Sequence, residues 1–229
     1  ASQTINGRYM TELLKLGVLI SGSGSNLQSI IDHIEKGTLR AQIQMVVSNN
    51  AGAFGLTRAQ KHGIPCAVLN HRDYSSREDF DCELIRILQN AGVDLIVLAG
   101  FMRILSTSFL RAFENKIINI HPALLPSFPG THVQQMAVDY GVKFSGCTVH
   151  FVDEGVDTGP IIIQAVVPVC PDDTADALAA RILKEEHKIY PQAIRYFAEG
   201  RIVKNGRHVE IKNIKNPDHA VIHNPPLDR

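Results

Sequence analysis

Asn119 and His121 lie at the end of an apolar stretch, Ile117-Ile118-Asn119-Ile120-His121, directly before Pro122. Such a run predicts a buried strand, on which residues i and i+2 face the same way. Proline cannot extend a sheet ladder, so the strand should end at His121. An amide donor beside a group that titrates near neutrality suits acyl-type chemistry, in which one steadies an oxyanion and the other moves a proton. The alternative, that both only satisfy backbone groups, is less favoured for a pair than for a lone histidine.

A second candidate is the small-residue segment Gly22-Ser23-Gly24-Ser25-Asn26, which joins a predicted strand to a predicted helix. Free N–H groups at a helix N-terminus can hold a phosphate. The segment is not a Walker A loop, because no Lys-Ser/Thr pair follows, and Leu27 replaces the third glycine of a dinucleotide fingerprint. A phosphate loop and a tight turn capped by Ser25 or Asn26 are equally compatible with this segment.

Two other segments carry weaker signals. The acidic segment 153–160, with Asp157 near its middle, could bind a metal, orient a histidine or be solvated. The lack of a His or carboxylate cluster at ligand spacing argues against metal, and taken alone the solvated loop is favoured. The apolar segment 99–105, with Arg103, suits either a pocket wall for a flat heterocycle or a plain strand-to-helix turn. Arg77 at a helix start opposes the helix dipole, which only weakly indicates an anionic partner.

The first part of the chain alternates between strand and helix patterns. Strands are predicted at Leu14–Ser21, Gln42–Ser48, Cys66–Leu69, Leu95–Ala99 and Ile117–His121, and helices at Asn26–Lys36, Ala53–His62, Ser76–Asn90 and Ser106–Phe113. This alternation predicts an α/β fold, a Rossmann-like, mostly parallel twisted sheet with helices on both faces. The carboxyl ends of its strands are where such sheets keep their ligand sites.

The pattern changes after the proline-rich segment 122–130. A short helix is predicted at Val133–Tyr140, and two strand-like runs, Phe144–Asp153 and Ile161–Val169, should form an antiparallel C-terminal pair because their connection is short. Thr174–Glu199 predicts a long amphipathic helix, kinked at Pro191 and ended by Gly200. The tail from Arg201 is polar with short strand-like pieces, and we assign it no role.

Composition places few limits on function. The chain has 229 residues, 45% of them hydrophobic, with 23 basic and 23 acidic side chains, so no net field favours nucleic acid or an anionic membrane. No apolar stretch suits a membrane span. The dispersed residues Cys66, Cys82, Cys147 and Cys170 indicate reduced thiols and a cytoplasmic protein. Residues 1–9 are expected to be a cloning remnant or a disordered N-terminus, with 10–229 as a single domain.

Four stretches together resemble the phosphoribosylglycinamide formyltransferases (GAR transformylases), which are folate-dependent formyltransferases. These are segments 20–27, 97–105, 119–126 and 146–157. The resemblance runs from Leu16 to about Phe197. The Asn-x-His-Pro block at 119–122 is similar to that of all formyltetrahydrofolate-using transferases, whereas the Gly-Ser-Asn and Gly-Phe-Met-Arg blocks are more specific.

The resemblance implies a role for each matched residue. Asn119, His121 and Asp157 would be catalytic, with Asp157 holding His121 and favouring its imidazolium form. Glycinamide substrate would be bound by Gly24, Ser25, Asn26 and Glu186. Folate would be bound by Arg77, Asn119 and the wall Phe101, Met102, Arg103, Ile104 and Leu105. His132 and His150 match positions near the site, and Thr158 replaces a glycine found in some members.

The implied reaction moves a formyl group from 10-formyltetrahydrofolate, the co-substrate, to the amine of 5-phosphoribosylglycinamide in purine (IMP) biosynthesis, with no metal. A formyltetrahydrofolate deformylase would carry an extra N-terminal regulatory domain, and a methionyl-tRNA formyltransferase a further basic C-terminal domain. A non-catalytic folate- or nucleotide-binding module would not need Asn119, His121 and Asp157 intact. We therefore expect a cytoplasmic transferase acting on small molecules, monomeric or homodimeric, without nucleic-acid or membrane partners.

Overall fold

A seven-stranded sheet runs through the computed structural model, which describes residues 3–4, 12–214 and 222–225. The strand order is β4-β3-β2-β5-β6-β7-β8; pairs from β4 to β6 are parallel, and β6–β7 and β7–β8 are antiparallel. The predicted α/β sheet with an antiparallel C-terminal pair is therefore confirmed. The strands are β2 (Leu14–Ile20), β3 (Ala41–Ser48), β4 (Cys66–Val68), β5 (Leu95–Leu98), β6 (Ile117–His121), β7 (Phe144–Phe151) and β8 (Ile161–Pro168).

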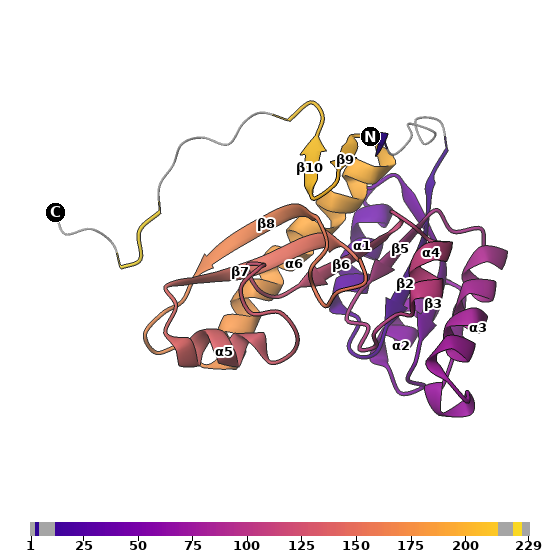
Figure 1. The fold of residues 1–229 in the computed structure, drawn as a ribbon, viewed down its shortest axis with the longest axis horizontal. Coiled ribbons are helices and arrows are strands. Elements are labelled where there is room, and N and C mark those ends of the chain that lie inside the picture. Colours follow the sequence, from indigo (N-terminus) through magenta and orange to yellow (C-terminus); the bar gives the residue numbers. More distant parts are fainter. Residues whose placement is uncertain (1–2, 5–11, 215–221, 226–229) are drawn as a thin grey trace.

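Helices cover both faces of this sheet, as predicted (Figure 1). On one face the helices are α1 (Ser25–Glu35), α2 (Phe54–Lys61), α5 (Val133–Tyr140) and α6 (Ala175–Ala198), and on the other they are α3 (Arg77–Asn90) and α4 (Thr107–Ala112). Val18 on β2 packs into the first layer and its neighbour Leu19 into the second. Because both faces of β2 are covered, the strand is apolar and buried from Leu16 to Ile20.

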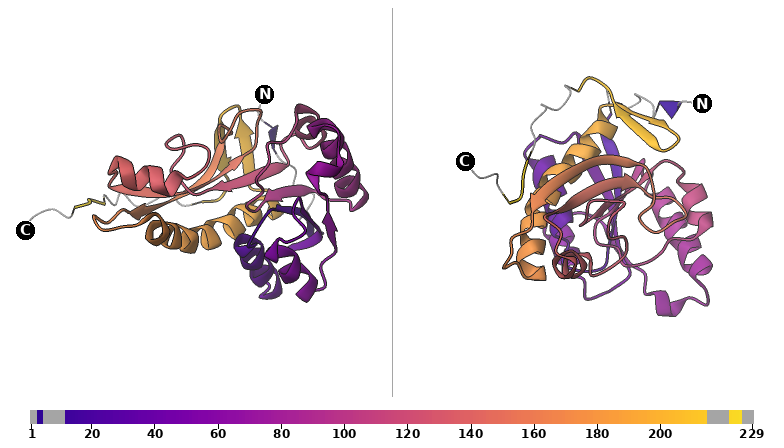
Figure 2. Two further views of the ribbon diagram at one scale, coloured as in Figure 1. Left: turned by 90° about the horizontal axis from the view of Figure 1, so that it is seen from below. Right: turned by 60° about the vertical axis from the view of Figure 1, so that its left-hand side comes forward.

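The antiparallel pair extends the sheet beyond its parallel part. Figure 2 shows α6 running along one face of this extension, and α6 packs against both β7 and β8. A short 3₁₀ helix, η2 (His71–Asp73), precedes α3. Within the described ranges, no helix has the length and apolar character of a membrane span.

Side-chain caps define several helix starts. Ser76 accepts a hydrogen bond from the N–H of Asp79 at α3, and Thr174 accepts one from Ala177 at α6. The start of α1 differs from prediction, because it begins at Ser25 and is capped by Gly24 in a left-handed conformation, φ 68°, rather than by a side chain. Glycine reaches this conformation without a steric penalty.

A second, three-stranded antiparallel sheet joins segments from both ends of the chain. Its order is β1 (Gln3–Thr4), β9 (Ile202–Asn205), β10 (His208–Ile211). The predicted loose segment 1–9 thus contains a paired strand, while residues 1–2 and 5–9 lie outside the described residues. The strand-like pieces predicted after Arg201 form a hairpin, which lies near β8 (Figure 1).

Tyr190 connects α6 to the centre of the sheet. Its side chain is fully buried, and its hydroxyl lies 2.7 Å from the carbonyl oxygen of Leu98 and 3.2 Å from that of Ile118. Burial raises the pKa of Tyr190 well above its ordinary value, so the hydroxyl stays a donor. The carbonyls belong to β5 and β6, and Ile118 directly precedes Asn119. Tyr190 therefore anchors α6 to the strand that carries Asn119.

We expect Tyr190→Phe to lower the free energy of unfolding by about 1–3 kcal/mol, because two buried carbonyl groups lose their shared donor. Urea denaturation of both proteins measures this difference. Tyr140→Phe is the matched control, because Tyr140 is 79% exposed and the phenyl ring keeps its contact with Phe128. Equal losses in the two variants would contradict the anchoring role of the Tyr190 hydroxyl.

Candidate active site

His121 lies at the carboxyl end of β6 and is only 3% exposed. Its Nδ1 lies 3.4 Å from Oδ2 of Asp157, and its Nε2 lies 2.8 Å from the carbonyl oxygen of Phe128. Both ring nitrogens therefore face oxygen atoms that accept hydrogen bonds. A substrate that uses Nε2 must first displace the Phe128 carbonyl, which belongs to the proline-rich segment after β6.

Asp157 is in the loop between β7 and β8, and its backbone has φ 55°. This left-handed conformation is uncommon for a residue other than glycine and requires support from its surroundings. Oδ2 accepts the N–H of Gly130 at 2.9 Å, and Oδ1 lies 3.7 Å from Nε2 of His150. Of the three interpretations of this acidic loop, the structure favours orientation of a histidine, which is His121. The described residues contain no group of three or more His, Cys, Asp or Glu side chains suited to a metal.

Asn119 is paired directly with His150 across the β6–β7 ladder. Its Nδ2 lies 3.4 Å from Nε2 of His150, whose Nδ1 is 2.8 Å from the carbonyl oxygen of Phe151. That oxygen only accepts, so Nδ1 carries the proton and Nε2 accepts from the amide. Burial lowers the pKa of His150, although the Phe151 carbonyl and Asp157 act against this, so the neutral ring is favoured. An amide nitrogen has two hydrogens, which leaves one of Asn119 for a ligand.

The turn before α1 packs tightly against α2. A Cβ atom on Gly24 would lie 2.5 Å from Cα of Gly55, and the N–H of Gly55 donates to the carbonyl of Gly22 at 3.0 Å. Nε of Arg58, also on α2, donates to the carbonyl of Ser23 at 2.9 Å. The structure thus adds α2 to this loop, and no sequence signal had identified Arg58.

Asn26 and Glu186 are brought together although they are far apart in the sequence. Nδ2 of Asn26 donates to Oε2 of Glu186 at 2.7 Å, while Oδ1 of Asn26 is buried without a hydrogen-bond partner in the described structure. Burial raises the pKa of Glu186, and the hydrogen bond from Asn26 and the charge of His121 partly oppose this shift. Glu186 therefore connects the glycine loop to the side of the site that contains His121.

The segment after β5 meets the segment after β2. The N–H of Ser21 donates to the carbonyl of Gly100 at 3.0 Å, and Oγ of Ser21 accepts from the N–H of Met102 at 2.8 Å. The connections from β2 and β5 leave the sheet in opposite directions, and such switch points form ligand crevices. The glycine loop and the segment 100–105 therefore lie at the same edge.

The predicted folate wall is divided between core and surface. Phe101 and Leu105 belong to the core beneath α3 and α4, whereas Met102 and Ile104 are 68% and 63% exposed. The guanidinium of Arg103 lies 4.7 Å from the centre of the Phe80 ring. Two other predicted residues are exposed: Arg77 contacts Glu78, and His132 precedes α5.

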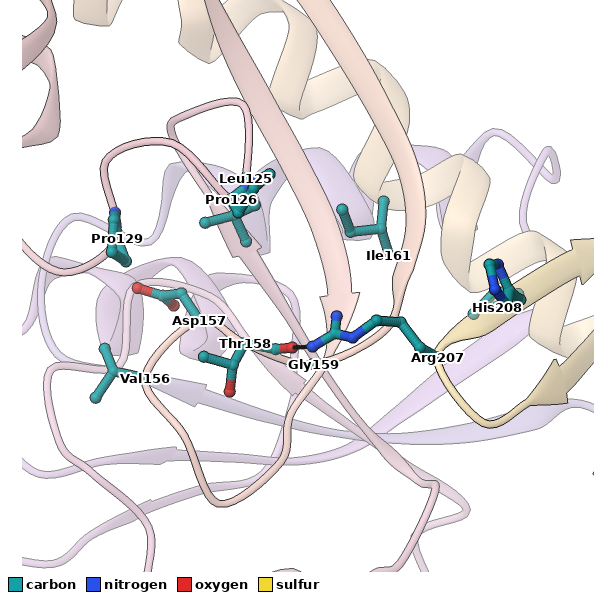
Figure 3. A pocket seen from close by; sticks show the side chains of 11 residues that line it. Leu125, Pro126, Pro129, Val156, Asp157, Thr158, Gly159, Ile161, Arg207 and His208 are labelled. Atoms are coloured by element: carbon teal, nitrogen blue, oxygen red, sulfur yellow. Dashed lines mark hydrogen bonds between the residues drawn. The ribbon is translucent and has the colours of Figure 1, made fainter.

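A cavity of about 640 Å³ is lined in part by the Asp157 loop. It is bounded by the proline-rich segment, the Asp157 loop and the β9–β10 hairpin (Figure 3). Arg207, in the hairpin turn, donates from Nη2 to the carbonyl of Thr158 at 2.5 Å. The tail that sequence analysis left without a role thus touches the loop that carries Asp157. The cavity is lined by Leu125, Pro126, Pro129, Val156, Asp157, Thr158, Gly159, Ile161, Arg207, His208 and Val209.

Comparison with known proteins shows similarity over most of the chain. Residues 14–194 match the family described as formyl transferase. A phosphoribosylglycinamide formyltransferase from Haemophilus influenzae is 46% identical over 188 residues, which cover 82% of this chain and 89% of that protein. The crystal structure of glycinamide ribonucleotide transformylase 1 from Symbiobacterium toebii superimposes with a TM-score of 0.87 at 51% identity, covering 90% of this chain and 97% of that one.

Longer relatives contain a similar segment. The trifunctional purine biosynthetic protein adenosine-3 of Drosophila melanogaster is 53% identical over 188 residues, 81% of this chain. The matched segment is only 14% of that relative, so the chain spans about a seventh of its length.

The lowered pKa of His150 predicts a pH dependence of stability. Below about pH 6.5 the unfolded chain binds a proton at His150 that the folded protein resists, so stability should fall as pH decreases. His150→Gln removes the titrating side chain. The difference in free energy of unfolding between wild type and variant should therefore change with pH, by up to about 1 kcal/mol per pH unit. Urea denaturation between pH 5 and 9 measures it. Above pH 7.5 the difference should be constant, and a constant difference down to pH 5 would contradict a neutral buried His150.

Proposed function

The chain belongs to the formyl transferase family, and we propose that it transfers the formyl group of 10-formyltetrahydrofolate to the amine of 5-phosphoribosylglycinamide in purine biosynthesis. The contact of His121 with Asp157, beside Asn119, carries this proposal. The names of the relatives support the choice of an amine acceptor. A cytoplasmic location, a single domain and a monomeric or homodimeric state are part of the same proposal.

The proposed chemistry begins when the amine attacks the formyl carbon and its carbonyl oxygen gains negative charge. Asn119 has one N–H that His150 does not occupy, and this donor would stabilise the oxyanion. Protonated His121, held by Asp157, would be a second donor once the Phe128 carbonyl has moved. The bond to N10 then breaks, and the proton lost by the amine reaches N10 directly or through a water. The products are formylated amine and tetrahydrofolate.

The remaining residues would bind the two substrates. The N–H groups of the turn at Gly24, Ser25 and Asn26 suit the phosphate, which helix N-termini favour. The buried carboxylate of Glu186 and the unpartnered Oδ1 of Asn26 suit hydroxyl or amine donors. The exposed side chains of Met102 and Ile104 suit the flat pterin, with Phe101, Arg103 and Leu105 behind them and Arg77 toward the anionic end.

The proposed acceptor can be tested directly. Release of tetrahydrofolate from 10-formyltetrahydrofolate should require 5-phosphoribosylglycinamide, because a transferase must position the amine and exclude water. The measurement is tetrahydrofolate and formate production with and without the amine. Rapid formate release in its absence would identify water as the acceptor and the protein as a deformylase.

His121→Ala and Asn119→Ala should each lower kcat by about 10²–10³-fold, because each removes a donor to the developing oxyanion. Binding of 5-phosphoribosylglycinamide should change little, since these groups act mainly on the transition state. Steady-state kinetics and calorimetry on the same preparations measure both quantities. His71→Ala, at an exposed histidine of η2, is the control. A His121→Ala protein with the kcat of the control would exclude His121 from catalysis.

A further inference from the structure

The β9–β10 hairpin presents Arg207 at its tip. Asn205 and His208 are paired, so Gly206 and Arg207 form a two-residue turn, and Gly206 has φ 57°. Two-residue hairpin turns require such left-handed positions. At the other end of the hairpin, the guanidinium of Arg201 donates to the carbonyls of Lys212 and Asn213. The base is therefore held in place, and the tip has a defined position. The hairpin lies outside residues 14–194, which match the family.

The tip contacts the residue that follows Asp157. Nη2 of Arg207 donates to the carbonyl oxygen of Thr158 at 2.5 Å (Figure 3). A charged donor makes a stronger hydrogen bond than a neutral one. The hydroxyl of Thr158 is used within the loop, because it donates to Oδ1 of Asp153 at 2.6 Å. Arg207 thus connects the loop to a separate sheet.

Asp157 needs this kind of support. Its left-handed backbone persists only when neighbouring contacts determine it. On one side its carboxylate is held by the N–H of Gly130. On the other side, Gly159 is packed so closely that a Cβ there would lie 1.7 Å from the carbonyl oxygen of Phe151. Between these points, the Thr158 carbonyl is fixed by Arg207.

We propose that Arg207 is a positioning residue for the Asp157 loop, and that its bond to Thr158 keeps the Asp157 carboxylate against His121 and His150. The proposal rests on the proposed catalytic role of Asp157. Arg207 does not touch the reacting atoms, and it acts through the orientation of the Asp157–Thr158 backbone. Its loss should therefore lower kcat and leave the KM for 5-phosphoribosylglycinamide unchanged, because Arg207 bonds to Thr158 and not to the glycine loop proposed to bind that substrate.

Arg207→Ala should lower kcat about tenfold, which corresponds to the loss of one hydrogen bond from a charged group. Arg207→Lys keeps a cationic donor and should recover part of this loss. Arg207 is exposed and lines the cavity, so added guanidinium ion can reach the Thr158 carbonyl and should restore activity to Arg207→Ala. It should not restore Asp157→Asn. Lys212→Ala, which removes an exposed charge at the hairpin base, is the matched control and should retain wild-type kcat.

A second measurement does not depend on activity. Arg207→Ala should shift the histidine ring NMR signals of His121 and His150, which contact Asp157, whereas Lys212→Ala should not. If the alanine variant unfolds, Arg207→Gln makes the same comparison. Unchanged ring signals together with wild-type kcat in the Arg207 variant would overturn the positioning role. If wild type itself transfers no formyl group, the proposed function fails, and the NMR comparison still decides whether Arg207 positions the loop.

Discussion

The antiparallel pairing of β6 with β7 is the constraint on which the site depends. It sets Asn119 opposite His150, and it sends the chain on from Phe151 into the loop that returns Asp157 to His121. Because β7 is antiparallel to β6, it ends at Phe151 opposite Ile118, and the loop after it returns along β6 to bring Asp157 to His121. The reversed direction of β7 relative to its neighbours β6 and β8 therefore helps to bring an amide, two imidazoles and a carboxylate together at one site.

A second set of contacts joins this cluster to the switch point of the sheet. Ser21 connects the segments after β2 and β5, and Asn26 reaches Glu186 on α6. The buried hydroxyl of Tyr190, one turn further along α6, holds that helix to β5 and β6. Each connection uses a polar group whose burial would be costly if it were unpaired. The polar network therefore fixes the helices and the site in one arrangement.

Local signals were sufficient to predict much of this arrangement. The ends of several elements were predicted from single residues, which restrict or cap the backbone locally. These are Pro122 after β6, Gly63 and Gly200 after helices, and Ser76 before α3. The strand periodicity also placed Asn119 and His121 on one face. Sequence spacing could not predict contacts that depend on strand register and on packing between distant segments. Three such contacts are Asn119 with His150, Asn26 with Glu186, and Arg207 with Thr158.

The contact between Gly24 and Gly55 limits how the protein can vary. A methyl group on Gly55 would lie 2.5 Å from Cδ1 of Ile20, and one on Gly24 would meet the Gly55 backbone at the same distance. Gly24 also has a left-handed backbone, so a side chain at this position would be unfavourable on both steric and conformational grounds. A side chain on Gly24 would force α2 away from the loop, and one on Gly55 would require Ile20 to move. The close packing of these two glycines therefore restricts the substitutions that directed evolution of substrate preference could use at this loop.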